Sequence, residues 1–156
     1  MNRYKGYDRY DENQIGFFGK ILLIFMVIAY PMMVSIYPIL PPLIGLVGYI
    51  IITNVNKNMI YTLSGVFYLF NLDLNLTLPM LLSLFIVVVT YLLVYMKLKL
   101  LIRCRVCLLF VLILFIDFAY YMSLFIYDFI FTTSTVVGDG LLIFYIVVDI
   151  FIGVFL

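Results

Sequence analysis

The stretch Val106–Thr132 reads VCLLFVLILFIDFAYYMSLFIYDFIFT, with two aspartates as its only charged residues. A helix that crosses the hydrocarbon core of a bilayer needs about 20 predominantly apolar residues. This stretch has that length, and so does Leu76–Met96, which reads LTLPMLLSLFIVVVTYLLVYM, with Pro79 expected in its first helical turn. The sequence therefore predicts at least two membrane-spanning helices in this part of the chain.

The composition of the whole chain also indicates a membrane environment. Of its 156 residues 67% are hydrophobic and only 11% are charged, and the mean hydropathy is +1.27. Soluble domains have about 45–50% apolar and about 25% charged residues. A bilayer is therefore the solvent that fits, and we expect an integral membrane protein in contact with lipid. The net charge of +1 offers no basic surface for a nucleic acid.

Four further apolar segments complete the expected arrangement. They are Phe17–Tyr37, Leu43–Val55, Met59–Leu72 and Leu141–Leu156. The proline-rich run Pro38–Pro42 cannot continue a regular helix and predicts a turn. The polar clusters Asn54–Asn58 and Asn71–Asn75 predict two more turns. The second and third segments are near or below spanning length, so they can form a tight hairpin, shallow helices, or spans in a locally thinned membrane.

Lysine and arginine give an independent test, because they collect on the cytoplasmic side of membrane proteins. With six spans and a cytoplasmic N-terminus, the inner regions are residues 1–20, 54–58 and 97–105. All nine cationic residues fall in these regions: Arg3, Lys5, Arg9, Lys20, Lys57, Lys97, Lys99, Arg103 and Arg105. The outer turns are residues 38–42, 73–75 and 133–140. These turns contain no Lys or Arg and hold Asp73 and Asp139.

The predicted fold is therefore an all-α, polytopic transmembrane helix bundle of about six spans, with both termini cytoplasmic. Residues 1–16 are expected to form a short polar cytoplasmic tail, and residues 17–156 a single transmembrane domain. If residues 43–72 formed a hairpin that did not cross, Lys57 would move to the outer side and the other assignments would stand.

Two carboxylates inside predicted spans, Asp117 and Asp149, are candidate site residues. A charge at the centre of a bilayer costs about 2.5–3.5 kcal/mol on insertion scales, so both should face the bundle interior. They can serve a proton or cation path, make a polar contact with another membrane protein, or bond as neutral groups inside the bundle. For the last case the expected partners are backbone groups of a neighbouring helix or the side chains of Tyr120, Tyr121, Ser123 and Tyr145.

The basic stretch between the fourth and fifth spans carries Lys97, Lys99, Arg103 and Arg105. It can bind a cytoplasmic partner or anionic lipid, or act only as an anchor that fixes the orientation of the chain. Cys104 and Cys107 lie in the same stretch. One CxxC pair supplies half of a zinc site and no second pair exists, so we expect two thiols at a helix start and no metal.

Signatures of an enzyme are absent from the sequence. The chain has no His, which is the commonest general base, and no GxSxG, P-loop or HExxH motif. The expected outer turns are too short to build an enzyme domain. We therefore expect a protein that is not an enzyme and uses no cofactor. Three classes of function stay open: a structural scaffold, a transport or ion-coupling subunit that uses Asp117 and Asp149, and an accessory subunit of a larger membrane complex.

One stretch resembles a known family. Pro42-Leu43-Ile44-Gly45 precedes the polar turn Asn54–Asn58, and Gly65-Val66-Phe67-Tyr68-Leu69-Phe70-Asn71-Leu72-Asp73 follows. This order resembles the rod shape-determining protein MreD family, in which a proline opens a short second span and the third span has the form GFxxGxxxD. Gly65 and Asp73 stand at the family spacing, whereas Leu69 replaces the middle glycine. Asp117 stands where the family tends to carry an aspartate in its fifth span.

The resemblance implies a non-enzymatic subunit of the bacterial cell-elongation machinery in the inner membrane. Such a subunit would bind a single-span MreC-like protein and link the cytoplasmic MreB filament to the peptidoglycan synthase RodA and its transpeptidase. Its fold would be similar to the six-helix substrate-binding subunits of energy-coupling-factor vitamin transporters. Gly65, Asp73, Asp117 and Asp149 would then serve helix packing or partner contacts.

Overall fold

The computed structural model describes residues 17–76, 79, 81–102, 104–131 and 141–155, and every regular element in this part of the chain is a helix. The helices are α1 (Phe17–Ile36), α2 (Ile44–Asn54), α3 (Met59–Asn75), α4 (Leu82–Thr90), η1 (Tyr91–Tyr95), α5 (Met96–Leu101), α6 (Arg105–Phe131) and α7 (Leu141–Phe155). α4, the π-helical turn η1 and α5 follow one another without a break. The predicted all-α fold is thus confirmed for the described residues.

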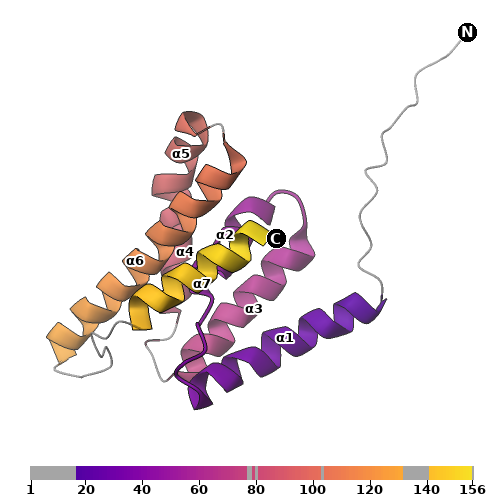
Figure 1. The fold of residues 1–156 in the computed structure, drawn as a ribbon, viewed down its shortest axis with the longest axis vertical. Coiled ribbons are helices and arrows are strands. Elements are labelled where there is room, and N and C mark those ends of the chain that lie inside the picture. Colours follow the sequence, from indigo (N-terminus) through magenta and orange to yellow (C-terminus); the bar gives the residue numbers. More distant parts are fainter. Residues whose placement is uncertain (1–16, 77–78, 80, 103, 132–140, 156) are drawn as a thin grey trace, which may run out of the picture.

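The helices alternate in direction along the bundle (Figure 1). The connections from α2 to α3 and from α5 to α6 lie toward the upper end in this view, and the ends of α1, α3 and α6 lie toward the lower end. α2 is the central element, since it packs against α3, α4, α6 and α7, whereas α1 packs mainly against α3. This placement brings the start of α2 into the interior of the bundle.

Two helical stretches, Leu82–Leu101 and Val106–Phe131, are long and apolar enough to cross a membrane. The other apolar helical stretches are shorter: Ile21–Ile36 within α1, Ile44–Asn54 and Ile143–Phe155. α2 has 11 residues, which at 1.5 Å per residue make about 17 Å, well below the hydrocarbon thickness of about 30 Å. The extended, proline-rich segment before α2 runs up along the bundle and adds to its reach (Figure 1).

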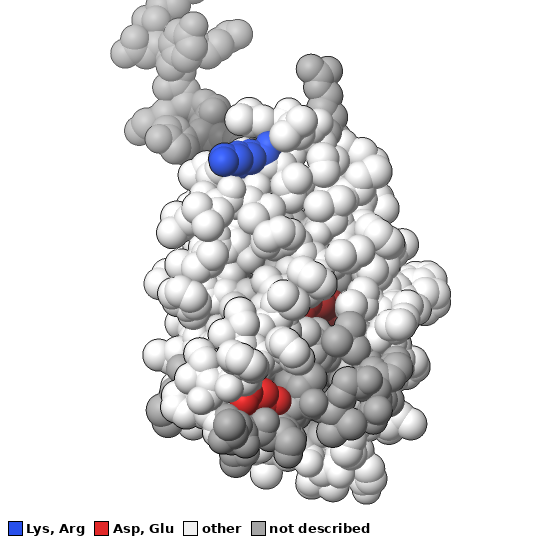
Figure 2. Space-filling view, turned by 90° about the vertical axis from the view of Figure 1, so that its left-hand side faces the viewer, with Lys and Arg blue, Asp and Glu red and all other residues white. Residues whose placement is uncertain are grey.

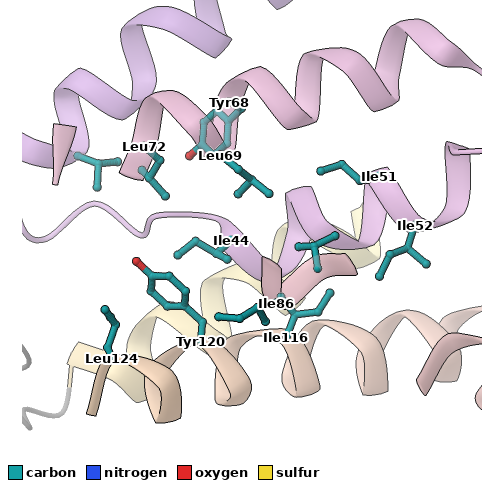
Figure 3. Close-up of a cluster of buried hydrophobic side chains, with 12 residues drawn as sticks. Ile44, Ile51, Ile52, Tyr68, Leu69, Leu72, Ile86, Ile116, Tyr120 and Leu124 are labelled. Atoms are coloured by element: carbon teal, nitrogen blue, oxygen red, sulfur yellow. The ribbon is translucent and has the colours of Figure 1, made fainter. Parts of the chain in front are cut away.

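The core surrounds α2 with apolar side chains of α3 and α6 (Figure 3). Figure 3 shows Ile44 of α2 between Leu72 of α3 and Tyr120 of α6. The backbones approach closely at Gly65, where an added Cβ would lie 2.6 Å from Cγ1 of Ile51. Small residues allow this close packing of helices, which supplies dispersion contacts between them.

Most predicted segments are confirmed as helices with bounds that differ by one residue. The exception is the region from Asp73 to Pro79. Asp73 was predicted in an outer turn, but α3 continues to Asn75 and buries Asp73 in its last turns. Pro79 was predicted in the first turn of a helix, but it precedes α4, which begins at Leu82. The reason is that the carboxyl group of Asp73 bonds to the start of α4, so this polar residue belongs to the interior.

The first part of the basic stretch 97–105 is helical and not a loop. α5 continues to Leu101, so Lys97 and Lys99 lie on its surface, and the ammonium of Lys99 lies 5.7 Å from the ring centroid of Tyr95. Arg103, the predicted tail 1–16 and the predicted outer turn 133–140 lie outside the described residues.

Charge is distributed unevenly along the bundle. On the face in Figure 2, a cationic side chain lies at one end of the bundle, and the acidic atoms that reach the surface lie near its middle and toward the opposite end. Large apolar side chains cover the surface between these regions; Phe25, Phe85 and Phe125, for example, are each about two-thirds exposed. Such an apolar exterior suits lipid tails better than water.

Candidate functional site at the starts of two helices

The first turn of α2 receives a hydrogen-bond acceptor from another helix. Leu43 precedes the helix in the left-handed backbone region, with φ 52°, and no side chain of its own segment caps the helix. The first amides of a helix have no acceptor within the helix and need one when buried. The N–H of Leu46 donates to Oδ2 of Asp149 at 3.4 Å. Asp149 of α7 thus caps α2 across 103 residues of sequence.

Asp117 of α6 reaches the same turn of α2. Its carboxyl group lies directly against Gly45, since a Cβ added there would lie 2.6 Å from Oδ1 and 2.7 Å from Cγ of Asp117. Asp117 and Asp149 are 5% and 2% exposed. The structure therefore brings the two predicted site residues together, and the absence of a side chain at position 45 makes room for one of them.

The start of α4 uses the same arrangement. Leu81 precedes α4 with φ 68° and without a side-chain cap of its own segment. Oδ2 of Asp73 accepts a hydrogen bond from the N–H of Ser83 at 3.2 Å and from its hydroxyl at 2.8 Å. Asp73 is 1% exposed. Two helices that begin inside the bundle are thus capped by buried carboxyl groups of other helices.

Tyrosines hold the proline-rich segment that leads into α2. The hydroxyl of Tyr30 donates to the carbonyl of Pro41 at 2.9 Å, and the hydroxyl of Tyr68 donates to the carbonyl of Pro42 at 2.8 Å. The hydroxyl of Tyr145 donates to the carbonyl of Pro38. Proline has no N–H and cannot build a regular ladder, so these side chains of α1, α3 and α7 supply the bonds that fix the segment.

Several buried oxygen atoms lack a hydrogen-bond partner within the described part of the chain. They are Oδ1 of Asp73, Oδ2 of Asp117, Oδ1 of Asp149 and the hydroxyl of Tyr120. Burying a polar atom without a partner is costly. The cost is smallest when a carboxyl group is protonated or when a small polar species bonds to it, so the pair Asp117–Asp149 can chemically hold a proton.

The predicted partners of the aspartates are only partly correct. A backbone amide of α2 is the partner of Asp149, which is one of the alternatives that the sequence left open, and Asp117 lies against Gly45 of the same turn. The hydroxyl of Ser123 instead donates to the carbonyl of Tyr120 in its own helix at 2.7 Å, and Tyr145 bonds to the proline-rich segment. The roles of Gly45 and Ser83 were missed. A glycine directly after Pro-Pro-Leu-Ile was the only signal for the first.

A comparison with known proteins gives no match to a protein family, to a curated protein or to a solved structure.

Proposed function

We propose that the chain is a non-enzymatic scaffold subunit that crosses the bacterial inner membrane six times, with both termini in the cytoplasm. The alternating helices, the apolar exterior and the position of Lys57 and the end of α5 toward the same end of the bundle support this topology. Under it, Lys57 and the end of α5 lie on the cytoplasmic side.

The orientation can be tested at Cys104, which is exposed between α5 and α6. A membrane-impermeant maleimide is expected to leave Cys104 unlabelled in intact cells and to label it in inside-out vesicles. Hydrogen bonds from Cys107 lower the pKa of the Cys104 thiol. The thiolate is the reacting form, so labelling in vesicles should begin at a lower pH than for an ordinary exposed thiol.

The matched control is Tyr37→Cys in a variant that lacks both native cysteines. Tyr37 is exposed and lies at the opposite end, directly after α1. It should show the reverse pattern, with labelling in intact cells. Labelling of Cys104 in intact cells would contradict the proposed orientation.

The observation that carries the scaffold proposal is that the residues of the MreD-like stretch make contacts between helices. Pro42 is bonded by Tyr68, Gly65 packs against Ile51, and Asp73 caps α4. Each of these residues holds helices together, and none lines an open catalytic cleft. A rigid helical subunit of this kind suits the binding of other membrane proteins, and the resemblance favours an MreC-like partner in the cell-elongation machinery.

Depletion of the protein from its native host tests this proposal. We expect rod-shaped cells to become spheres, because peptidoglycan synthesis would no longer be directed along the cell length. Cell outlines and the pattern of newly inserted wall material give the measurement. Unchanged shape and wall growth after depletion would refute the scaffold role.

A second candidate function is ion coupling, which the unpartnered oxygens of Asp117 and Asp149 favour. The same depletion strain separates the two functions. The double variant Asp117→Asn, Asp149→Asn keeps a carbonyl acceptor at each position and should restore the rods if the chain is a scaffold. If depletion leaves the cell shape unchanged, and the double variant accumulates at the normal level but loses ion flux in membrane vesicles, ion coupling is the better assignment.

A further inference from the structure

A cleft opens between α2, α6 and α7 at the end of the bundle where α2 meets α3. Its volume is about 290 Å³. The lining residues are Leu46, Tyr49, Ile50, Thr53, Asn54, Lys57, Val106, Leu109, Gly153 and Val154. Ligand pockets of proteins begin at about 300 Å³, so the cleft has room for a small polar group together with the beginning of a chain, and not for a large ligand.

One rim of the cleft is polar and offers both donors and an acceptor. The side-chain donors of Thr53 and Asn54 are used within α2, since they bond to the carbonyls of Tyr49 and Ile50. Oδ1 of Asn54 stays free to accept. The ammonium of Lys57 and the hydroxyl of Tyr49 form no hydrogen bond or ion pair with the described residues, so these donors are free as well. A matching ligand group therefore carries a negative charge and at least one hydroxyl.

The remaining wall of the cleft is apolar and leads to the outside of the bundle. Leu46, Leu109 and Gly153 form its inner part. At Gly153 an added Cβ would lie 2.8 Å from Cδ1 of Ile113, so the missing side chain keeps α7 close to α6. Val106 and Val154 flank the opening and are 57% and 55% exposed. An apolar chain can thus leave the cleft at this exposed edge, over Val106 and Val154, and join the surrounding lipid.

We propose that this cleft binds one anionic phospholipid whose head group carries hydroxyls, of the phosphatidylglycerol type. The phosphate lies at Lys57 and the hydroxyl of Tyr49, and a head-group hydroxyl donates to Asn54. One acyl chain passes between Val106 and Val154. Basic pockets between membrane helices are a common place for anionic head groups, and the choline of a zwitterionic lipid would meet Lys57 with a like charge.

Lipid retention by the full-length protein tests this site. The protein is reconstituted in vesicles of equal parts phosphatidylglycerol and phosphatidylcholine, extracted in mild detergent, and the retained lipids are counted by native mass spectrometry. The unchanged protein should retain phosphatidylglycerol in preference to phosphatidylcholine. Lys57→Gln should lower this preference about fivefold, which corresponds to about 1 kcal/mol for one Lys near an anionic surface.

Two further variants separate the cleft from general charge and from unfolding. Lys99→Gln removes another exposed cation, on α5 and outside the cleft, and should leave retention unchanged. Val154→Phe narrows the opening and keeps all charges, and it should lower retention as Lys57→Gln does. Excess glycerol phosphate without acyl chains should not displace the lipid. Equal retention by Lys57→Gln and the parent, or an equal loss in Lys99→Gln, would overturn the proposal, provided that thermal unfolding of the variants matches the parent.

Discussion

Gly45→Ala is expected to lower the free energy of unfolding by about 1–3 kcal/mol, the range for overpacking a tight interior. The added methyl group would lie within 2.7 Å of three atoms of the Asp117 carboxyl group. The carboxyl group of Asp117 would have to turn away from Gly45, or α2 would have to move away from α6. Either change weakens the capped start of α2. Unfolding in mixed detergent micelles, followed by near-ultraviolet circular dichroism of the 14 tyrosines, measures the loss.

Gly48→Ala is the matched control, since it makes the same substitution one turn later in α2. Its Cβ would meet methyl groups of Ile116 and Val87 at 3.0 to 3.3 Å, and no polar atom among its three nearest neighbours. The intrinsic gain of helix propensity is the same for both variants. We therefore expect a clearly smaller loss for Gly48→Ala. An equal loss in the two variants would show that the carboxyl group is not the cause.

A double-mutant cycle assigns the effect to the contact itself. In an Asp117→Ala background the carboxyl group is gone, so Gly45→Ala should cost much less than in the parent. Residues in contact show coupling energies of about 0.5–3 kcal/mol. Additive losses would mean that Gly45 and Asp117 act independently, which would contradict the close approach between α2 and α6.

The sequence predicts the long helices well because their lengths are set by uninterrupted apolar runs. α1 and α6 begin and end near polar residues or prolines, α7 begins after a polar segment, and these signals are local. The end of α3 and the start of α4 were wrong for the opposite reason. Asn71 to Asn75 looks like a polar turn, yet Asp73 is polar because it bonds to Ser83, ten residues away. A local pattern cannot distinguish a polar residue that faces water from one that caps another helix.

The candidate site was predictable in part. The cost of a charge in an apolar environment predicts that Asp117 and Asp149 face inward, and both are buried. Their partner was not predictable, because the start of α2 lies 103 residues from Asp149 in sequence and its amides have no side-chain signature. The left-handed backbone at Leu43 and Leu81 also has no sequence signal, since this conformation normally favours glycine.

Asp73→Ala is expected to cost about 1–3 kcal/mol for each buried donor that it leaves without an acceptor. The N–H of Ser83 loses its acceptor outright. The hydroxyl of Ser83 keeps a second acceptor, the carbonyl of Leu69 at 3.5 Å, so its loss is smaller. Amide hydrogen exchange should show the effect first in the opening turn of α4, before the whole bundle unfolds.

Two milder variants remove only part of the contact between Asp73 and Ser83. Ser83→Ala removes the hydroxyl bond and keeps the amide bond, so a loss of about 1 kcal/mol is expected. Asp73→Asn keeps one carbonyl oxygen for the amide and should fall between Ser83→Ala and Asp73→Ala. Equal stability of Asp73→Ala and the parent would refute the capping role.

The same series separates folding from partner binding at Asp73. If Asp73→Asn retains the fold and restores rods in the depletion strain, then the aspartate acts through the cap alone. If it retains the fold and the cells stay spherical, then the carboxyl group serves a contact with another protein as well. Because Asp73 is buried against α4, we expect shape and stability to fall together across the three variants.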